Sequence, residues 1–213
     1  MNAEATGLVM RSPDGTRYVF DPGALCLEFL TTGGPGDLAA FEVLHTPGDL
    51  AGWLARSRLG LAREDVRVTG SELAAAHRLR DALWGLARAA AHGQRREARH
   101  TAEVNRAASH PPPVPRMEED GAVRGWQPPV AGRQALSAVA RDAVELFTGP
   151  FASRVRECGA PDCRLVFVDV SRPGRRRWCA MERCGNRHKV RALRARRERD
   201  DARESDDRKE PGR

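Results

Sequence analysis

Hydrophobic residues between positions 46 and 150 recur at the three- and four-residue spacing of amphipathic helices. The clearest run follows Thr69, where Glu72 completes a capping box that predicts the start of a long helix. Its apolar positions are Leu73, Ala76, Leu79, Leu83, Leu86 and Ala90. Gly93 predicts the end of this helix, since glycine is the usual residue just beyond a C-terminus.

Three further helices are predicted around this one. Thr46-Pro47-Gly48-Asp49 is a helix start, with a capping threonine and a proline at the first helical position. Residues 95–108 are predicted to form a less apolar helix. Residues 133–148 form the last one, which Gly149-Pro150 should terminate.

Strand signals are short and scattered. Arg17–Phe20 predicts a strand, whereas residues 24–30 are apolar and ambiguous between strand and helix. The Asp-Gly pair within residues 110–130 predicts a hairpin turn. Residues 164–170 alternate like a strand, and we expect residues 175–178 to return beside them after a turn.

These elements predict a mainly α protein with short β-hairpins, an α+β fold. We expect a mostly helical domain over residues 1–150 and a small module over residues 151–200, in which a hairpin is followed by a helix in a treble-clef-like arrangement. Residues 201–213 are charged and almost free of apolar side chains, which predicts a disordered tail.

Charge is distributed unevenly along the 213 residues. The chain has a net charge of +7, but residues 171–199 hold twelve Lys or Arg and two Glu, a net charge of +10, which leaves −3 for the rest. Such a basic segment predicts a polyanionic partner. The N-terminal sequence is not a secretory signal and no apolar stretch is long enough for a membrane span, so we expect a cytoplasmic protein without a membrane partner.

Four of the five cysteines form two close pairs, Cys158 with Cys163 and Cys179 with Cys184, separated by fifteen residues. Zn²⁺ takes four such ligands in a tetrahedron, and a hairpin between the pairs would bring them together. With four protein ligands no position is left for water, so the sequence predicts one structural Zn²⁺.

Other interpretations of the cysteines are an iron–sulfur cluster or four unrelated thiols, and a redox dithiol is disfavoured because neither pair is C-x-x-C. The fifth, Cys26, lies between leucines and is expected to be a small buried residue. Four nearby arginines would offset the negative charge of the zinc thiolates: Arg176, Arg177, Arg183 and Arg187.

The segment from Trp178 to Lys189 contains Cys-Gly-Asn-Arg and resembles the CGNR zinc finger. The upstream region is similar to the ABATE domain, with an opening signature at residues 25–32 that has Glu28 and Thr31 where the family more often has Asp and Asn. The resemblance covers about residues 17–195. It implies a bacterial, stress-linked transcription regulator, and so raises the expectation of DNA binding.

A basic helix is predicted to begin after Cys184, with Asn186 as its cap. We expect the zinc module to present it to DNA, and the predicted contacts are Arg175, Arg176, Arg177, Arg187, Lys189, Arg191 and Arg194. The alternative is a solvated helix whose arginines only balance the thiolates. Trp178 either packs in the core over the zinc knuckle or stacks on a base of the nucleic acid. His188 would bind the zinc only if one of the four cysteines did not.

Four functions compete on these observations. The first is a transcription regulator whose N-terminal domain senses a small-molecule effector or forms a homodimer. The second is a zinc-stabilised module for docking another protein. An RNA-binding protein is disfavoured by the aromatic content of 5%. An enzyme is not expected, because the histidines are dispersed and no catalytic triad, HExxH or phosphate-loop motif is present.

Overall fold

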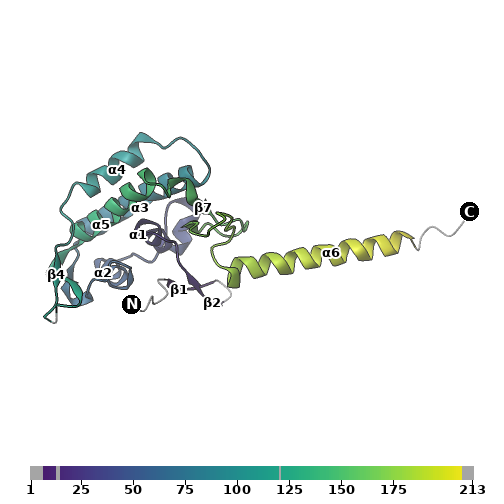
Figure 1. The fold of residues 1–213 in the computed structure, drawn as a ribbon, viewed down its shortest axis with the longest axis horizontal. Helices are drawn as coiled ribbons and strands as arrows, with labels where there is room; N and C mark the ends of the chain where they lie inside the picture. Colours follow the sequence, from purple (N-terminus) through teal and green to yellow (C-terminus); the bar gives the residue numbers. More distant parts are fainter. Residues whose placement is uncertain (1–6, 13–14, 120, 208–213) are drawn as a thin grey trace, which may run out of the picture.

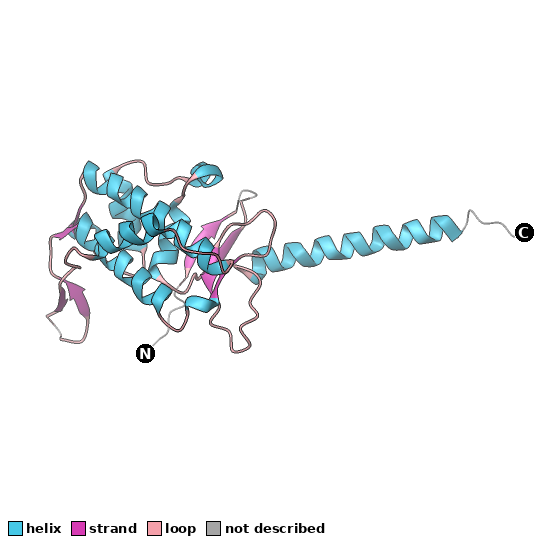
Figure 2. Ribbon diagram, turned by 90° about the horizontal axis from the view of Figure 1, so that it is seen from above, coloured by secondary structure: helices cyan, strands magenta, loops and turns pink. Residues whose placement is uncertain are grey.

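The protein is described by a computed structural model that covers residues 7–12, 15–119 and 121–207. A body of packed helices carries short two-stranded sheets at its edges, and one long helix points away from it (Figures 1 and 2). The mainly α architecture with short β-hairpins is thereby confirmed.

The centre of the body is formed by α3 (Gly70–Ala91), α4 (Ala98–Ala108) and α5 (Gly132–Thr148), which pack against one another. The apolar side chains that they bury include Leu79, Leu83, Leu86, Val104, Val139 and Ala143. Gly85 of α3 is required by this packing, since a Cβ there would lie 2.2 Å from the His100 ring of α4. The predicted helical spacing therefore corresponds to the buried faces of these helices.

Both predicted capping boxes are present. At the start of α2 (Pro47–Arg56), the Thr46 hydroxyl accepts a hydrogen bond from the Asp49 N–H at 3.2 Å, and the Asp49 carboxylate accepts one from the Thr46 N–H at 2.7 Å. Thr69 and Glu72 repeat the exchange before α3, at 3.3 and 2.8 Å. Each box satisfies amide groups that a helix end leaves without partners.

The ambiguous segment after residue 24 is helical. It forms α1 (Leu25–Phe29) and continues as the 3₁₀ turn η1 (Leu30–Thr32), and a second 3₁₀ helix, η2 (Gly36–Phe41), follows a glycine-rich bend. Cys26 is fully buried, as predicted, and its N–H donates to the Asp142 carboxylate of α5 at 2.8 Å. The segment whose periodicity was ambiguous is thus a short helix that is buried against α5.

Two small sheets lie on the body. β3 (Val66–Arg67) pairs in parallel with β6 (Val130–Ala131), beside the short turn η3 (Arg63–Asp65). β4 (Pro115–Met117) pairs with β5 (Arg124–Trp126) and forms the hairpin predicted within residues 110–130. Asp120 of its predicted turn lies outside the described residues.

The last part of the chain holds an antiparallel pair, β7 (Val155–Glu157) and β8 (Val166–Val168), preceded by the short turn η4 (Ala152–Arg154). The prediction that residues 175–178 pair with this second strand is wrong. β8 pairs instead with β7, because the first cysteine pair itself forms the turn of the hairpin, and residues 175–178 run as irregular chain.

The final helix, α6 (Asn186–Asp207), is preceded by one wide π-helical turn, η5 (Met181–Gly185). Asn186 is thus the first residue of α6 and not its cap, because the helical turns begin five residues earlier. The helix continues to Asp207, into the segment predicted to be a tail, and residues 208–213 lie outside the described part. None of the described helices is both long and apolar enough to cross a lipid bilayer.

The N-terminal hairpin joins the C-terminal module. β1 (Leu8–Arg11) pairs with β2 (Arg17–Phe20), and the buried side chains Tyr18 and Phe20 pack with the four paired cysteines and Phe167 in a second, smaller core. β8 lies between the two cores, since its outer residues Val166 and Val168 face the helical body while Phe167 faces the cysteines. The alternating side chains of one strand thus connect the two cores.

Candidate metal centre

The four paired cysteines meet at one point. Their sulfur atoms all lie within 4.8 Å of one another, with Cys163 and Cys179 sulfurs 3.7 Å apart and Cys179 and Cys184 sulfurs 3.5 Å apart. Four sulfurs at about 2.3 Å from a tetrahedral zinc would be separated by about 3.8 Å. All four residues are buried, with at most 6% of their surface exposed. The donor set fits zinc in type, number and spacing.

Local turns place each cysteine pair. The chain turns from β7 to β8 through Cys158 and Cys163, where the Cys158 N–H donates to the Leu165 carbonyl at 2.9 Å and the Cys163 N–H to the Ala160 carbonyl at 3.1 Å. The second pair closes from the other side, with Cys184 in the turn η5 that leads into α6. The metal site thus joins the hairpin directly to the base of the helix.

These cysteines form the site of one structural Zn²⁺, which when bound crosslinks the hairpin and η5. With four protein ligands there is no open position for a substrate or a water molecule. Hydrogen bonds that the Cys179 thiol makes with Cys158 and Cys163, together with burial, raise the pKa of this thiol in the metal-free site. Zinc binding must therefore release protons, and acid should favour loss of the metal.

Two arginines contact the sulfurs. Arg187 donates to the Cys184 sulfur at 3.5 Å and Arg183 to the Cys163 sulfur at 3.9 Å. The hydrogen bond with Cys184 raises the pKa of Arg187 and keeps its guanidinium charged. These positive charges offset the net negative charge of a tetrathiolate zinc site. The sequence predicted this balancing role for both residues.

Arg187 also forms a two-point ion pair with Asp162, at 2.9 and 3.2 Å. Asp162 stands in the turn between the first two cysteines and also receives the Arg191 guanidinium at 3.3 Å. The carboxylate therefore links the cysteine turn to two successive turns of α6. Sequence reasoning missed Asp162, because its partners lie more than twenty residues away along the chain.

Arg176 has a structural role, because its guanidinium is turned inward. Its guanidinium donates to the carbonyls of Asp21, Trp178 and Cys179 and stacks on the Phe167 ring, 4.1 Å from its centroid. Burial lowers the pKa of this guanidinium, although the surrounding negative groups oppose the change. Arg176 therefore differs from its exposed neighbours in sequence.

Asp169 shapes the turn that carries Arg176. This carboxylate is fully buried and accepts hydrogen bonds from the N–H and hydroxyl of Ser171 and from the Arg176 N–H. Aspartate side chains commonly accept a hydrogen bond from the backbone N–H two residues later in a turn, so this role of Asp169 could have been inferred from the sequence.

The remaining predicted DNA contacts differ in exposure. Arg187 is half-buried against the metal site. The exposed members of the predicted set are Arg175, Arg177, Lys189, Arg191 and Arg194. Exposure makes these five side chains accessible to a partner.

Trp178 and His188 lie beside the metal site. Trp178 is half-buried against the zinc core, and the centroid of its ring is 4.7 Å from that of His188. The cluster of potential ligands consists of the four cysteines, and His188 is not part of it. The packing of Trp178 agrees with a core role over the zinc knuckle.

Tyr18 of the N-terminal hairpin reaches the same site. Its hydroxyl accepts a hydrogen bond from Arg183 at 3.0 Å, and the Arg183 guanidinium lies 4.9 Å from the Tyr18 ring centroid. Burial raises the pKa of Tyr18 to about 12. No local pattern in the sequence indicates that residues 7–20 complete a module at the other end of the chain.

The N-terminal signature residues have separate roles. Glu28 is buried, its carboxylate accepts a hydrogen bond from the Arg58 guanidinium at 2.7 Å, and burial raises its pKa. The Thr31 hydroxyl donates to the Glu28 carbonyl at 2.8 Å, and Thr31 borders a cavity. Glu28 thus acts in the fold of the body, and Thr31 lies next to open space.

Comparison with known families agrees with this architecture. Residues 23–150 match the ABATE family, described as "Putative stress-induced transcription regulator", and residues 154–197 match the CGNR zinc finger. No curated protein matches the chain. Both families are regulator or zinc finger types and not enzyme families. The chain therefore belongs to the ABATE family and carries a CGNR zinc finger at the four-cysteine site.

Proposed function

We propose that this protein is a transcription regulator that binds double-stranded DNA through the first half of α6. The observation that carries the proposal is a basic helix that points away from the body and is fixed at its base to a metal site (Figures 1 and 2). The match to a family described as a transcription regulator supports it.

The dimensions of α6 suit a DNA groove. Its 22 residues correspond to a rod about 33 Å long. The major groove is about 12 Å wide and admits one α-helix. The basic side chains of residues 186–199 are Arg187, Lys189, Arg191, Arg194, Arg196, Arg197 and Arg199. All of these except the half-buried Arg187 are exposed, so they can reach phosphates without rearrangement of the fold. Arg191 would exchange its ion pair with Asp162 for a phosphate.

The base of the helix is held in position. Arg187 connects Asp162 and the Cys184 sulfur, so its role is to orient α6 rather than to contact DNA freely. We assign the DNA contacts to Lys189, Arg191 and Arg194, with Arg175 and Arg177 as exposed supporting groups from the zinc module. Arg176 is left out of the set because its guanidinium is bound to backbone carbonyls.

The charge of α6 changes sign along its length. Residues 200–207 contain five acidic residues and one arginine. Phosphates would repel this acidic end of the helix, so DNA contact is limited to the part of α6 next to the zinc module. The acidic residues thus mark where the proposed DNA-binding surface of α6 ends.

The test is fluorescence anisotropy with a labelled duplex of mixed sequence, titrated at several salt concentrations. If each of the five assigned side chains neutralises one phosphate, log K against log salt should have a slope of about −4.5. The double variant Arg191→Gln, Arg194→Gln should weaken binding and make the slope shallower by about 2. The matched control is Arg95→Gln, Arg99→Gln, which removes the same charge from exposed sites on the body. Binding that ignores salt, or an equal loss in both variants, contradicts the proposal.

A second candidate function is docking of another protein on α6. The observation that favours it is the exposure of Val190 and Leu193, which are 48% and 51% exposed and lie three residues apart on the helix. The double variant Val190→Ser, Leu193→Ser separates the two functions. If the arginines bind DNA, this variant should keep its DNA affinity. If the apolar pair binds another protein, the variant should lose that protein.

A further inference from the structure

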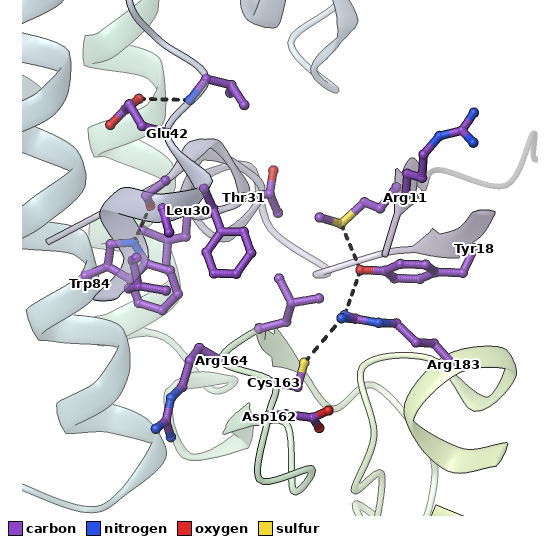
Figure 3. Close-up of a pocket in the computed structure, with 17 residues that line it drawn as sticks. Arg11, Tyr18, Leu30, Thr31, Glu42, Trp84, Asp162, Cys163, Arg164 and Arg183 are labelled. Atoms are coloured by element: carbon purple, nitrogen blue, oxygen red, sulfur yellow. Dashed lines mark hydrogen bonds between the residues drawn. The ribbon is translucent and has the colours of Figure 1, made fainter. Parts of the chain in front are cut away.

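A cavity of about 350 Å³ lies between the zinc module and the helical body (Figure 3). Most of its lining comes from three distant parts of the chain: the N-terminal hairpin with Met10 and Tyr18, the segment from Leu30 to Val43, and the cysteine turn from Asp162 to Leu165. Trp84 and Arg183 complete it. A volume of this size is typical of sites for small molecules.

The wall on the body is rigid and apolar. Trp84 of α3 is buried, and its indole N–H donates to the Gly33 carbonyl at 2.8 Å. Gly34 must be glycine here, because a Cβ would lie 2.3 Å from the Trp84 ring nitrogen. Leu30 is buried beside this pair. The bend is thus fixed on α3, and this wall exists before any ligand arrives.

The mouth of the cavity exposes large apolar side chains. Phe41 is 58% exposed and Val43 is 52% exposed, and both line the cavity. Solvent-exposed apolar groups gathered at a concave surface are typical of a ligand site. An apolar molecule in the cavity would cover them and gain hydrophobic free energy.

The charged groups of the lining favour an anion. Its two carboxylates are already paired: Glu42 with the buried Arg80, and Asp162 with arginines of α6. Of its arginines, Arg11 donates to the Gly15 carbonyl at 3.3 Å, and Arg164 has an ion pair with Glu157 at 3.7 Å. Both side chains are exposed and lie at opposite edges of the cavity (Figure 3), so a ligand anion can recruit the one that its acidic group reaches.

We propose that this cavity binds a small amphipathic organic anion, with an aromatic or aliphatic body against Leu30, Phe41 and Trp84 and an acidic group at one edge, where it meets Arg11 or Arg164. The site contacts the zinc module directly, because Cys163 and Arg183 belong to the lining. Occupancy therefore acts on the part of the molecule that holds α6.

Asp162 provides the connection to α6. It borders the cavity on one side, and its carboxylate binds Arg187 and Arg191 on the other. A ligand that draws Arg164 or the cysteine turn toward itself would shift this carboxylate and free or reorient Arg191. This regulatory step rests on the proposed DNA-binding function, whereas ligand binding itself does not.

The binding test uses the fluorescent anion anilinonaphthalene sulfonate and its uncharged analogue phenylnaphthylamine as probes for the full-length zinc-loaded protein. We expect saturable binding of one sulfonate probe per chain, tighter than that of the neutral probe. Ala40→Trp should abolish binding, since Ala40 is an exposed residue of the lining and the larger side chain fills the mouth.

A second variant keeps the test valid if the tryptophan disturbs the fold. The double change Arg11→Gln, Arg164→Gln should weaken the sulfonate probe roughly tenfold and leave the neutral probe unchanged. The control is Arg17→Gln, which alters the partner of Arg11 in the same hairpin, outside the lining. Equal affinities for both probes, or a sulfonate affinity that survives both the Ala40 and the arginine changes, overturns the proposed site.

The regulatory step is tested separately by the DNA anisotropy assay with and without saturating sulfonate probe. We expect the probe to change DNA affinity in the wild type and not in Asp162→Asn, where the link to α6 is weakened. If the protein binds both the probe and DNA but the probe does not change DNA affinity, the regulatory step is refuted and the ligand site stands. Probe binding in a protein that binds no DNA refutes the DNA proposal and leaves the ligand site standing.

Discussion

The helical body and the zinc module are stabilised in different ways. The body buries a large continuous set of apolar side chains from α1, α2, α3, α4 and α5. The second core has eight buried residues, of which four are the paired cysteines. So few apolar groups cannot offset the conformational entropy lost on folding, and the metal must supply the difference. Neighbouring parts of one chain can therefore depend on different forces.

The two regions also differ in how their residues find one another. In the body, α3, α4 and α5 pack through faces set by helical spacing, although α1 also reaches α5 at the other end of this domain. In the zinc module, Tyr18 meets Arg183 and Asp21 meets Arg176, pairs that are more than 150 residues apart. The metal region is thus assembled from both ends of the described chain, around a middle that folds by local rules.

The largest expected effect is that of Cys184→Ser, which should break the zinc module and spare the body. Structural zinc sites bind their metal with about 10 kcal/mol or more, and this energy is folding energy. We expect loss of stoichiometric zinc by elemental analysis. Hydrogen exchange should accelerate over residues 155–185, while α3 stays protected.

The control for this experiment is the fifth cysteine. Cys26→Ala alters a fully buried residue of the body and should leave one zinc per chain. A Cys184→Ser protein that keeps both its metal and the slow exchange of residues 155–185 would show that the module does not depend on the four-sulfur site.

A smaller effect is expected where the two regions meet. Arg176→Ala removes the guanidinium that joins the Asp21 carbonyl to those of Trp178 and Cys179, and should cost roughly 2–3 kcal/mol. Arg175→Ala removes the same side chain from an exposed neighbour and should leave stability unchanged within about 0.5 kcal/mol. Urea unfolding of both variants measures the difference, and equal midpoints would refute the internal role of Arg176.

The smallest effect concerns acid and the body. Burial opposes ionisation of Glu42, but hydrogen bonds from Arg80 and the Leu44 N–H outweigh it and lower the pKa to about 2. The ion pair therefore stabilises the protein fully above about pH 4.5, and this stability is lost as the pH falls through about 2. Solvent reaches part of this carboxylate, so the contribution is about 1–2 kcal/mol.

Unfolding measured between neutral pH and pH 2 tests this dependence. Glu42→Gln should be less stable than the wild type at neutral pH, and the two should converge near pH 2. Zinc release, followed in the same titration, is expected at a higher pH because protons compete for the thiolates. A constant difference between the proteins across the whole range would contradict the role of Glu42.

Local chemistry made much of this molecule predictable. Thr46 with Asp49 and Thr69 with Glu72 identified two helix starts, because capping involves residues only three positions apart. The cysteine pairs identified the metal site for the same reason. The return strand at residues 175–178 was predicted wrongly, since pairing between strands depends on which segment the whole fold brings alongside.

Long-range contacts account for what was missed. Arg176 is one of the seven predicted DNA contacts, which cannot be told apart in the sequence. Only the carbonyls that it binds in the structure distinguish it from the others. The cavity is lined by residues from distant parts of the chain, and none of these parts shows a binding motif by itself. Neither feature could be found without knowing how the hairpin, the bend after η1 and the cysteine turn converge.

The position of the N-terminal hairpin limits how this zinc finger can be transplanted. The family match for the finger begins at residue 154, yet Tyr18 and Phe20 form part of its interior. A segment excised at the matched boundaries would expose Phe167 and leave Arg183 without its aromatic partner. Chimaeric regulators built from this protein would need to carry the leading strands along with the finger, or replace them with an equivalent cover.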